Sequence, residues 1–530
     1  MSSSTDNKAM APVDNKIHDS HSEYDPELGS DTESLGKGDV LSLESVDPVL
    51  NAKMHLVNNT IDEIGFTPYH AKLFVLNGFG YAVDSLVLLI QSIIAQQAAY
   101  EFNPSWTKGL TVAAYVGMLV GALFWGISAD VIGRKFAFNV SLIVCSVFAI
   151  VAGASPNWTV LGLFTCLAAF GGGGNLVLDT AVFLEYLPGK FQWLITMMAL
   201  WWGLGQLVAG LFAWAYLPNF SCDEPPAICT YDNNKGWRYV WYTSGALVFA
   251  MSMLRITVIR LKETPKFLVG EGKDEEVVEV LSSIASKYNR PCSLTMERLQ
   301  ACGVTGERRA SVTAHAKSKW SPNEIWVHLK GLYVTRKIGL STTLIWFSWL
   351  LIGLAYPLYN VYLPLYLKSR GAETGDGSSY TQWRNYAIIN VAGIFGPILA
   401  GAMCASRLFW GRRGTMIIGA LITMIFFFAY TQVRTPAQNL GFNCAISFCL
   451  NIYYGCLYAY TPEVLPSAHR GTGNGIAIGF NRIMGIISAV VATYANTATA
   501  VPIYICAALY IVMAIVAAAF PFEPYGRRSS

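Results

Sequence analysis

The chain has 530 residues, of which 53% are hydrophobic and only 13% are charged, and its mean hydropathy is +0.39. A soluble chain of this length needs far more polar surface, so the composition excludes a soluble globular protein. The net charge of +3 conceals an asymmetry, because residues 1–50 carry eleven acidic and three basic side chains, a net of −8.

The acidic N-terminal stretch is rich in Ser, Asp and Glu and poor in aromatic residues, so residues 1–69 are expected to form a disordered cytoplasmic tail. Twelve apolar runs follow, each near the length of about 20 residues that crosses a hydrocarbon core of about 30 Å. They must be helical, because lipid offers backbone amides no partners. The predicted spans are 71–98, 109–129, 136–155, 157–180, 193–218, 237–259, 337–365, 385–405, 414–432, 439–460, 472–496 and 499–520.

A repeat of charged turns divides these spans into two halves. Glu185 lies 52 positions after the start of the turn 133–135 (Gly-Arg-Lys), and Glu463 lies 52 positions after the start of the turn 411–413 (Gly-Arg-Arg). Equal spacing of the same chemistry predicts an all-α membrane protein with two pseudo-symmetric six-helix bundles. The predicted parts are bundles at 70–259 and 337–520, a cytoplasmic linker at 260–336 and a cytoplasmic tail at 521–530.

The linker contains apolar residues at helical spacing, namely Val277, Val280, Leu281, Ile284 and Tyr288. They predict an amphipathic helix that lies on the cytoplasmic face or against the bundles. A solvated linker helix without a role in gating is an equally good interpretation.

Basic residues set the expected orientation. An even number of spans places both termini on one side, and that side holds fifteen basic residues between positions 255 and 337 alone. The loops of the opposite side hold seven in total. Both termini are therefore expected in the cytoplasm, with the chain in the plasma membrane.

Cys222 and Cys229 share the external loop between the fifth and sixth spans. An oxidising exterior would permit a disulfide between them. Their spacing alone does not fix the geometry that a disulfide needs, so two free thiols remain the alternative.

The segment between the second and third spans reads Gly126-Ile-Ser-Ala-Asp130-Val-Ile-Gly133-Arg134-Lys135. It resembles the major facilitator superfamily signature Gly-x-x-x-Asp-x-x-Gly-Arg-Arg/Lys. Gly126 allows close helix approach, Asp130 can accept bonds from a helix N-terminus or an Arg, and Gly133 makes a tight turn. The resemblance implies that this cytoplasmic cluster latches the two halves in one state; a basic turn that only sets topology is the alternative.

Two further stretches resemble particular branches of this superfamily. Residues 263–267 (Glu-Thr-Pro-Lys-Phe) are similar to an element of sugar porters, and residues 461–473 look like a turn of sugar porters, organic-ion transporters and synaptic-vesicle-2-like carriers. The resemblance covers residues 70–520. It implies that Glu185, Glu463 and Arg470 join the cytoplasmic gate. Asp179, near the cytoplasmic end of the fourth span, and Arg412, in the second basic turn, are further candidates for this gate.

The chain departs from this pattern in two places. Leu408 stands where the second copy of the signature would need an acid, so a symmetric latch is not expected. The seventh span has no Gln between positions 346 and 360, whereas sugar porters carry a Gln-rich motif there. This difference disfavours a hexose as the substrate. The Asp-rich first span of phosphate and aromatic-acid carriers is matched only by Asp84.

Asp84 and Arg482 are charged residues deep within predicted spans. Asp84 lies thirteen residues into the first span, about 20 Å deep, and Arg482 lies ten residues into the eleventh, about 15 Å deep. A carboxylate at that depth usually faces an aqueous cavity or a partner, so Asp84 is the candidate for proton coupling, with a structural carboxylate as the alternative. Arg482 can form a structural ion pair or hold a substrate anion. Sequence does not fix whether the two side chains meet.

Polar side chains within the spans are the candidates for the substrate cavity, although many such residues only bridge helices. The candidates are Asn77, Gln91, Asn175, Gln206, Tyr356, Tyr359, Asn360, Asn390, Asn451, Tyr453 and Tyr454.

These patterns predict a secondary active transporter that moves a small polar organic solute, sugar-like or a carboxylate or organic ion, by alternating access. Proton symport is the leading interpretation; a proton-antiporting drug or metabolite exporter and a non-transporting nutrient sensor are the alternatives. No nucleotide motif, histidine relay or nucleophile–base set is visible, so we expect no cofactor, no metal and no catalytic residue. The expected partners are the solute, protons and the lipid bilayer, without nucleic acid, and the chain is expected to act as a monomer.

Overall fold

The computed structural model describes residues 48–222, 228–259, 261–303, 322–369, 378–494 and 501–525. All of them belong to one compact unit, Gly38–Ser530. Helices are the only regular elements in these described ranges.

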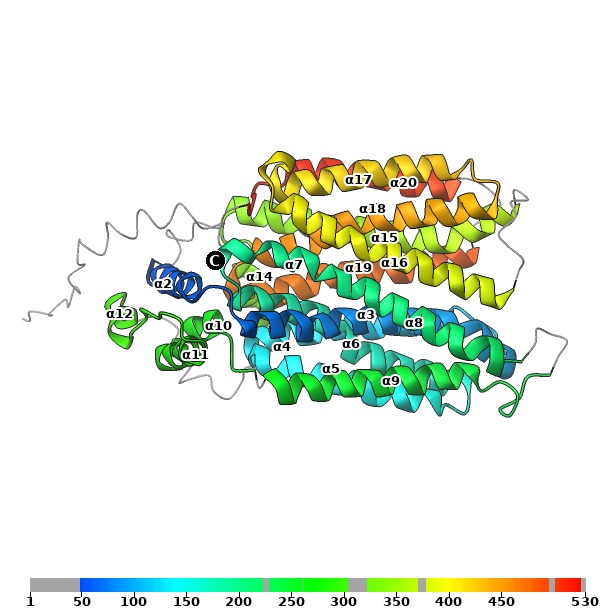
Figure 1. Cartoon of the computed structure of the whole chain (residues 1–530), viewed down its shortest axis with the longest axis horizontal. Helices are drawn as coiled ribbons and strands as arrows, with labels where there is room; N and C mark the ends of the chain where they lie inside the picture. Colours follow the sequence, from blue (N-terminus) through cyan, green and yellow to red (C-terminus); the bar gives the residue numbers. More distant parts are fainter. Residues whose placement is uncertain are drawn as a thin grey trace, which may run out of the picture. The chain divides into compact units, whose positions relative to one another are not determined.

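The first lobe contains the helices that precede the linker, and the second lobe those that follow it (Figure 1). The first lobe consists of α3 (Pro68–Phe102), α4 (Gly109–Val131), α5 (Arg134–Gly153), α6 (Trp158–Tyr186), α7 (Trp193–Met197) continued by α8 (Ala199–Phe220), and α9 (Gly236–Leu254). The second lobe consists of α15 (Arg336–Ser369), α16 (Ser379–Cys404), α17 (Gly411–Tyr430), α18 (Pro436–Glu463), α19 (Arg470–Tyr494) and α20 (Val501–Ala519).

Ten of the helices within the described ranges are long and apolar enough to cross a membrane, and residues 503–519 of α20 form a shorter apolar helix. The sixth helix of each lobe packs in a corresponding place: α9 lies against α5 and α3, the third and first helices of its lobe, and α20 lies against α17 and α15. The chain is thus an all-α membrane protein with twelve helices in two six-helix bundles, as the repeat predicted.

The lobes meet along two helix pairs, α4 with α19 and α8 with α16. Gly126 lets α4 approach α19 closely, because a Cβ at this position would stand 2.7 Å from the carbonyl oxygen of Gly471. Gly133, with φ +120°, forms the tight turn before α5, a conformation that other residues rarely adopt.

Residues 48–64, which the sequence placed in a disordered tail, form the helix α2 (Pro48–Ile64). Its apolar side chains, including Val57 and Ile61, are buried, and Lys53 Nζ lies 2.5 Å from Asp274 Oδ2 of the linker. A helix that buries such a face is stabilised by its packing, which explains the difference from the composition-based expectation.

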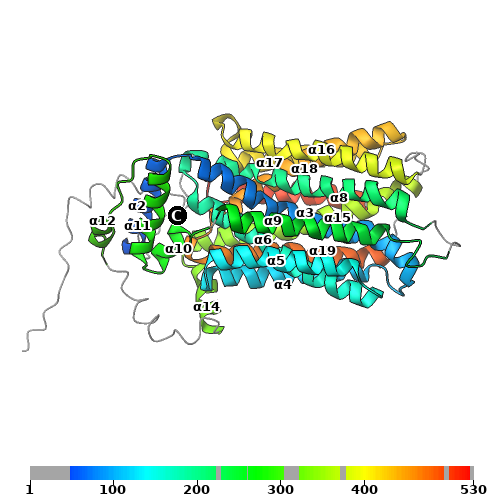
Figure 2. The same cartoon turned by 60° about the horizontal axis from the view of Figure 1, so that its bottom comes forward.

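The linker contains α10 (Pro265–Gly270), α11 (Asp274–Lys287), α12 (Met296–Ala301) and α14 (Pro322–Gly331). The predicted amphipathic helix is α11, which buries Val277, Val280 and Leu281. It packs against α10, α12 and α2, and these four helices lie together beyond one end of the bundles (Figure 2). We call this the linker end. The opposite end, which carries the loop from Ser221 to Lys235, is the disulfide end.

Candidate functional site

Asp84 and Arg482 meet at the interface between the lobes. Nη2 of Arg482 on α19 lies 2.7 Å from Oδ1 and 2.9 Å from Oδ2 of Asp84 on α3. Both residues are buried, with an exposed fraction of 4% for Arg482 and 0% for Asp84. A buried pair of this kind stabilises the contact between the lobes only while both charges are present.

Aromatic side chains from both lobes cover the pair. The indole Nε1 of Trp202 on α8 donates to Asp84 Oδ2 at 3.3 Å. The ring of Trp202 lies 5.8 Å from each of the rings of Tyr356 (α15) and Tyr454 (α18), which are 5.9 Å from each other. Gln206 Nε2 donates to Tyr356 Oη at 3.2 Å across the same interface. We call Trp202, Tyr356 and Tyr454 the aromatic box.

The box continues into further buried rings. Tyr458 stacks on Tyr454 at 5.8 Å and approaches Tyr81 of α3 at 5.6 Å. Trp349 of α15 lies 4.7 Å from Tyr458 and donates through Nε1 to Thr461 Oγ1 at 2.9 Å. Tyr81 and Trp349 therefore hold Tyr458 in place, and Tyr458 packs against the ring of Tyr454.

Four of the other cavity candidates form hydrogen bonds within their own lobes. Gln91 accepts a hydrogen bond from Thr111 Oγ1 at 3.2 Å, which joins α3 to α4. Tyr359 donates to Asn443 Oδ1 at 2.6 Å. Asn390 and Asn451 each donate to a carbonyl four residues earlier, Tyr453 is fully buried, and the side chain of Asn360 lies outside the described part of the structure.

At the linker end, Asp130 of α4 caps the N-terminus of α19. Its Oδ2 accepts from the backbone N–H of Thr472 at 2.7 Å and from the Thr472 hydroxyl at 2.9 Å, and Oδ1 accepts from the N–H of Gly471 at 3.2 Å. A carboxylate at a helix N-terminus satisfies amides that have no partner in the helix. This contact joins the two lobes.

Arg134 lies beside this cap. Its Nη2 is 3.4 Å from Asp130 Oδ1 and 3.3 Å from Glu185 Oε1, and it donates to the carbonyl oxygen of Ser467 in the second lobe at 3.0 Å. Arg470 Nη1 reaches the same Glu185 oxygen at 3.2 Å. We call Asp130, Arg134, Glu185 and Arg470 the linker-end cluster; all four are buried and they come from both lobes.

The turn 411–413 also contacts the opposite lobe, although it has no acid at the position of Asp130. Arg412 pairs with Glu463 through Nε and Nη2, and it also donates to Thr196 Oγ1 at 3.2 Å and to the carbonyl oxygen of Gln192 at 3.1 Å in the first lobe. Leu408, at the position of Asp130, is 79% exposed and caps no helix. The arginine contacts therefore recur in both lobes, whereas the aspartate cap occurs once.

Two glutamates outside the bundles hold these turns. Glu263 accepts hydrogen bonds from the backbone N–H groups of Arg134 at 2.9 Å and Lys135 at 3.2 Å. Glu523 accepts in the same way from residues 412–413, at 3.0 and 3.1 Å. The sequence resemblance drew attention to the first of these glutamates but gave no signal for the second.

Asp179 does not join the linker-end cluster, contrary to the prediction. It pairs with Arg255 at 3.0 Å inside the first lobe, where Arg255 also donates to Asn175 Oδ1 at 3.4 Å and Asn77 donates to the Asp179 carbonyl at 3.2 Å. Six positions separate Asp179 from Glu185, which turns the two side chains about 120° apart around α6.

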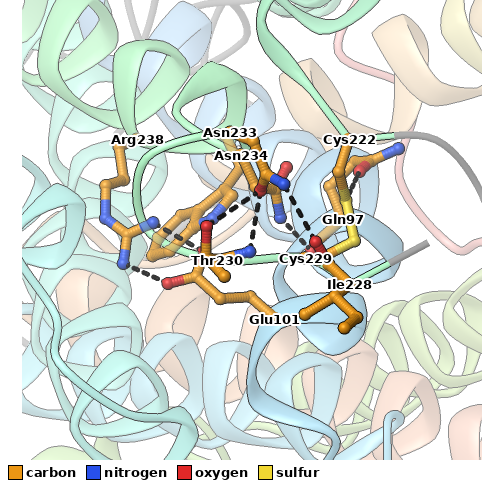
Figure 3. The surroundings of a disulfide bond; sticks show 10 residues. Gln97, Glu101, Cys222, Ile228, Cys229, Thr230, Asn233, Asn234 and Arg238 are labelled. Atoms are coloured by element: carbon orange, nitrogen blue, oxygen red, sulfur yellow. Dashed lines mark hydrogen bonds and ion pairs between the residues drawn. A yellow bond between two sulfur atoms is a disulfide. The ribbon is translucent and has the colours of Figure 1, made fainter.

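At the disulfide end, Cys222 and Cys229 form a disulfide with a Cα–Cα distance of 5.7 Å (Figure 3). Glu101 at the end of α3 binds Arg238 through two hydrogen bonds of 2.7 Å. Asn234 donates to the Gln97 carbonyl at 2.8 Å, so the loop is fixed to α3.

The chain belongs to the Major Facilitator Superfamily, since residues 73–489 match the sequence pattern that describes this family. It is 40% identical to MFS siderochrome iron transporter 1 of Ceriporiopsis subvermispora (strain B), over 96% of this chain and 97% of that protein. It is 26% identical to niacin transporter NiaP of Acinetobacter baylyi, over 83% and 90% of the two chains. It is 24% identical to the synaptic vesicle 2-related protein of Rattus norvegicus, over 94% and 86%.

The fold is similar to that of the proton:xylose symporter XylE bound to 6-bromo-6-deoxy-D-glucose. The TM-score is 0.63 at 18% sequence identity, over 87% of this chain and 98% of that one. At this identity the likeness concerns the fold alone. Together, the comparisons identify a multi-pass membrane transporter of the major facilitator type.

Proposed function

We propose that the chain imports a small organic anion together with a proton, by alternating access around Asp84 and Arg482. The observation that carries this proposal is the buried ion pair between the lobes. A proton on Asp84 removes the counterion of Arg482, and the anionic group of a substrate can then take its place. When the proton leaves on the other side, Asp84 regains Arg482 and displaces the substrate. One proton and one negative charge move together, so the step is electroneutral.

The linker end is proposed to face the cytoplasm. The basic residues between positions 255 and 337 support this orientation, and so does the disulfide at the opposite end, since disulfides persist in oxidising surroundings. The linker-end cluster joins the lobes on this side, so it would act as the gate that closes the cytoplasmic exit. Proton antiport would use the same pair with the solute moving outward.

A ferric siderochrome is the second candidate substrate. It is supported by the printed name of the relative that is 40% identical over nearly the whole of both chains. Iron would then be part of the substrate and not a resident of the protein.

The proposal is tested in proteoliposomes with an acidic exterior. Labelled sugars, carboxylates and a ferric siderochrome are offered, with uptake by protein-free vesicles subtracted. Asp84→Asn should abolish uphill accumulation of the transported solute but leave exchange, because exchange needs no net proton movement. Asp232→Asn, which changes a carboxylate that is 90% exposed in the disulfide-end loop, is the matched control and should accumulate normally. Accumulation that ignores the pH gradient, or that survives in Asp84→Asn, would contradict proton coupling.

A further inference from the structure

The guanidinium of Arg482 has hydrogen-bonding capacity that Asp84 does not use. Both carboxylate oxygens of Asp84 bind the same nitrogen, Nη2. Nε is buried and, within the described residues, has no hydrogen-bond partner. A guanidinium carries five N–H donors in a planar fork that matches a carboxylate, so a second anion can bind there.

The aromatic box is divided between the lobes. Trp202 belongs to the first lobe, whereas Tyr356 and Tyr454 belong to the second. Their ring separations of 5.8 Å lie within the range of favourable offset and edge-to-face contacts. When the lobes part at this site, the ring faces lose these contacts. A planar ring between the lobes would restore them, which gives such a solute a favourable interaction that is absent from the empty open site.

Two polar groups at the box are already engaged. Gln206 binds the hydroxyl of Tyr356, and the indole N–H of Trp202 binds Asp84. A site selects a polyol by presenting groups that are left unpaired without its hydroxyls. The box itself offers ring faces, and Arg482, bound to the same Asp84 as Trp202, offers a cation.

We propose that this site takes a planar aromatic carboxylate, with its ring in the aromatic box and its carboxylate on Arg482. The assignment rests on the proposed function, because the carboxylate replaces Asp84 as the counterion of Arg482. The ring selects for planarity and the guanidinium selects for negative charge, so both features are needed for binding.

Binding to the purified full-length chain in detergent, measured calorimetrically at pH 6, tests the two requirements separately. The probes are benzoate, cyclohexanecarboxylate with the same charge but a saturated ring, and benzamide with the same ring but no charge. Benzoate or its heteroaromatic analogue nicotinate should bind at least about tenfold more tightly than either comparison compound. Equal binding of cyclohexanecarboxylate, or preference for xylose or a ferric siderochrome, would overturn the assignment, and so would failure of both aromatic acids to bind.

Variants connect the measurement to the site. Trp202→Leu should weaken benzoate binding by about tenfold, whereas Trp202→Phe, which keeps a ring, should stay within about threefold of the original chain. Trp326→Leu is the control, since Trp326 lies in α14 and is 56% exposed. Unchanged binding in Trp202→Leu would contradict the proposal.

The outcome separates this inference from the proposed function. Calorimetric binding does not depend on a proton gradient, so an aromatic acid can bind even if transport is not proton-coupled. Conversely, gradient-driven uptake of a non-aromatic solute would support proton coupling while overturning the assignment of the substrate.

Discussion

Arg134 and Arg412 hold equivalent positions in the two lobes, and each binds a glutamate 51 positions later in the chain. Each also donates to a backbone carbonyl of the opposite lobe, Arg134 to Ser467 and Arg412 to Gln192. The repeat in the sequence is therefore a repeat of contacts that hold the lobes together at the linker end. The exception is Asp130, which has no acidic counterpart in the second copy.

Loss of the Asp130 cap should favour opening of the linker end. Asp130→Ala removes the acceptor for the first amides of α19, which typically costs about 1–2 kcal/mol and shifts an equilibrium by about 5- to 30-fold. A cysteine at Thr180, which contacts Asn474 across the interface at 3.3 Å, should then react faster with a maleimide. Leu408→Ala changes the equivalent exposed residue and should leave the rate unchanged. If both variants behave alike, the cap does not hold the lobes together.

Removing one partner of the buried Arg412–Glu463 pair should destabilise the chain more than removing both charges. Arg412→Met leaves Glu463 buried without its partner and should destabilise the chain by about 3–5 kcal/mol. Adding Glu463→Gln removes the uncompensated charge and should recover part of that loss. Thermal unfolding in detergent measures both, and Lys262→Ala in the exposed Lys262–Glu279 pair should show no measurable change. A double variant less stable than Arg412→Met would contradict this account.

The helices and the kinds of partner that Asp130 contacts could be predicted from the sequence, because they depend on local patterns. Runs of apolar residues determined the spans, and the signature around Asp130 indicated both kinds of partner that the structure shows, a helix N-terminus and an arginine. Arg255 was different: it was counted among the loop bases, but it begins a π-helix, Arg255–Ile259, and points back to Asp179.

The central site could be predicted only in part, because it depends on which helix faces meet. Asp84 and Arg482 were each recognisable as charges at membrane depth, but their pairing joins residues 398 positions apart. Trp202 gave no sequence signal, since tryptophan is common in membrane helices. The sequence did single out Tyr356 and Tyr454 of the aromatic box, but only as polar side chains within the spans.

The docking of α2 on the linker can be followed through Cys302. Burial raises the pKa of this half-buried thiol, so its thiolate fraction at pH 7 is below that of a free cysteine. With Cys302 as the only free thiol, its maleimide reaction should be slow at pH 7 and should rise about tenfold per pH unit up to pH 8.5.

Two variants separate docking from electrostatics. The positive charge of Lys53 lowers the pKa of Cys302 and the negative charge of Asp274 raises it, so a purely electrostatic effect would slow the reaction in Lys53→Ala and accelerate it in Asp274→Asn. Because either change breaks the ion pair that docks α2, we expect both variants to react faster. A slower reaction in Lys53→Ala would show that α2 remains docked without the pair.

The central claim is alternating access around Asp84 and Arg482, in which one end of the molecule opens while the other closes. Spin-label distances at the two ends test it most directly. Exposed positions Ile132 and Leu408 report on the linker end, and Trp106 and Val501 report on the disulfide end. In liposomes the two distances should each show two populations, and Asp130→Ala should lengthen the first distance while shortening the second. Distances that stay fixed, or that lengthen together at both ends, would contradict alternating access in this chain.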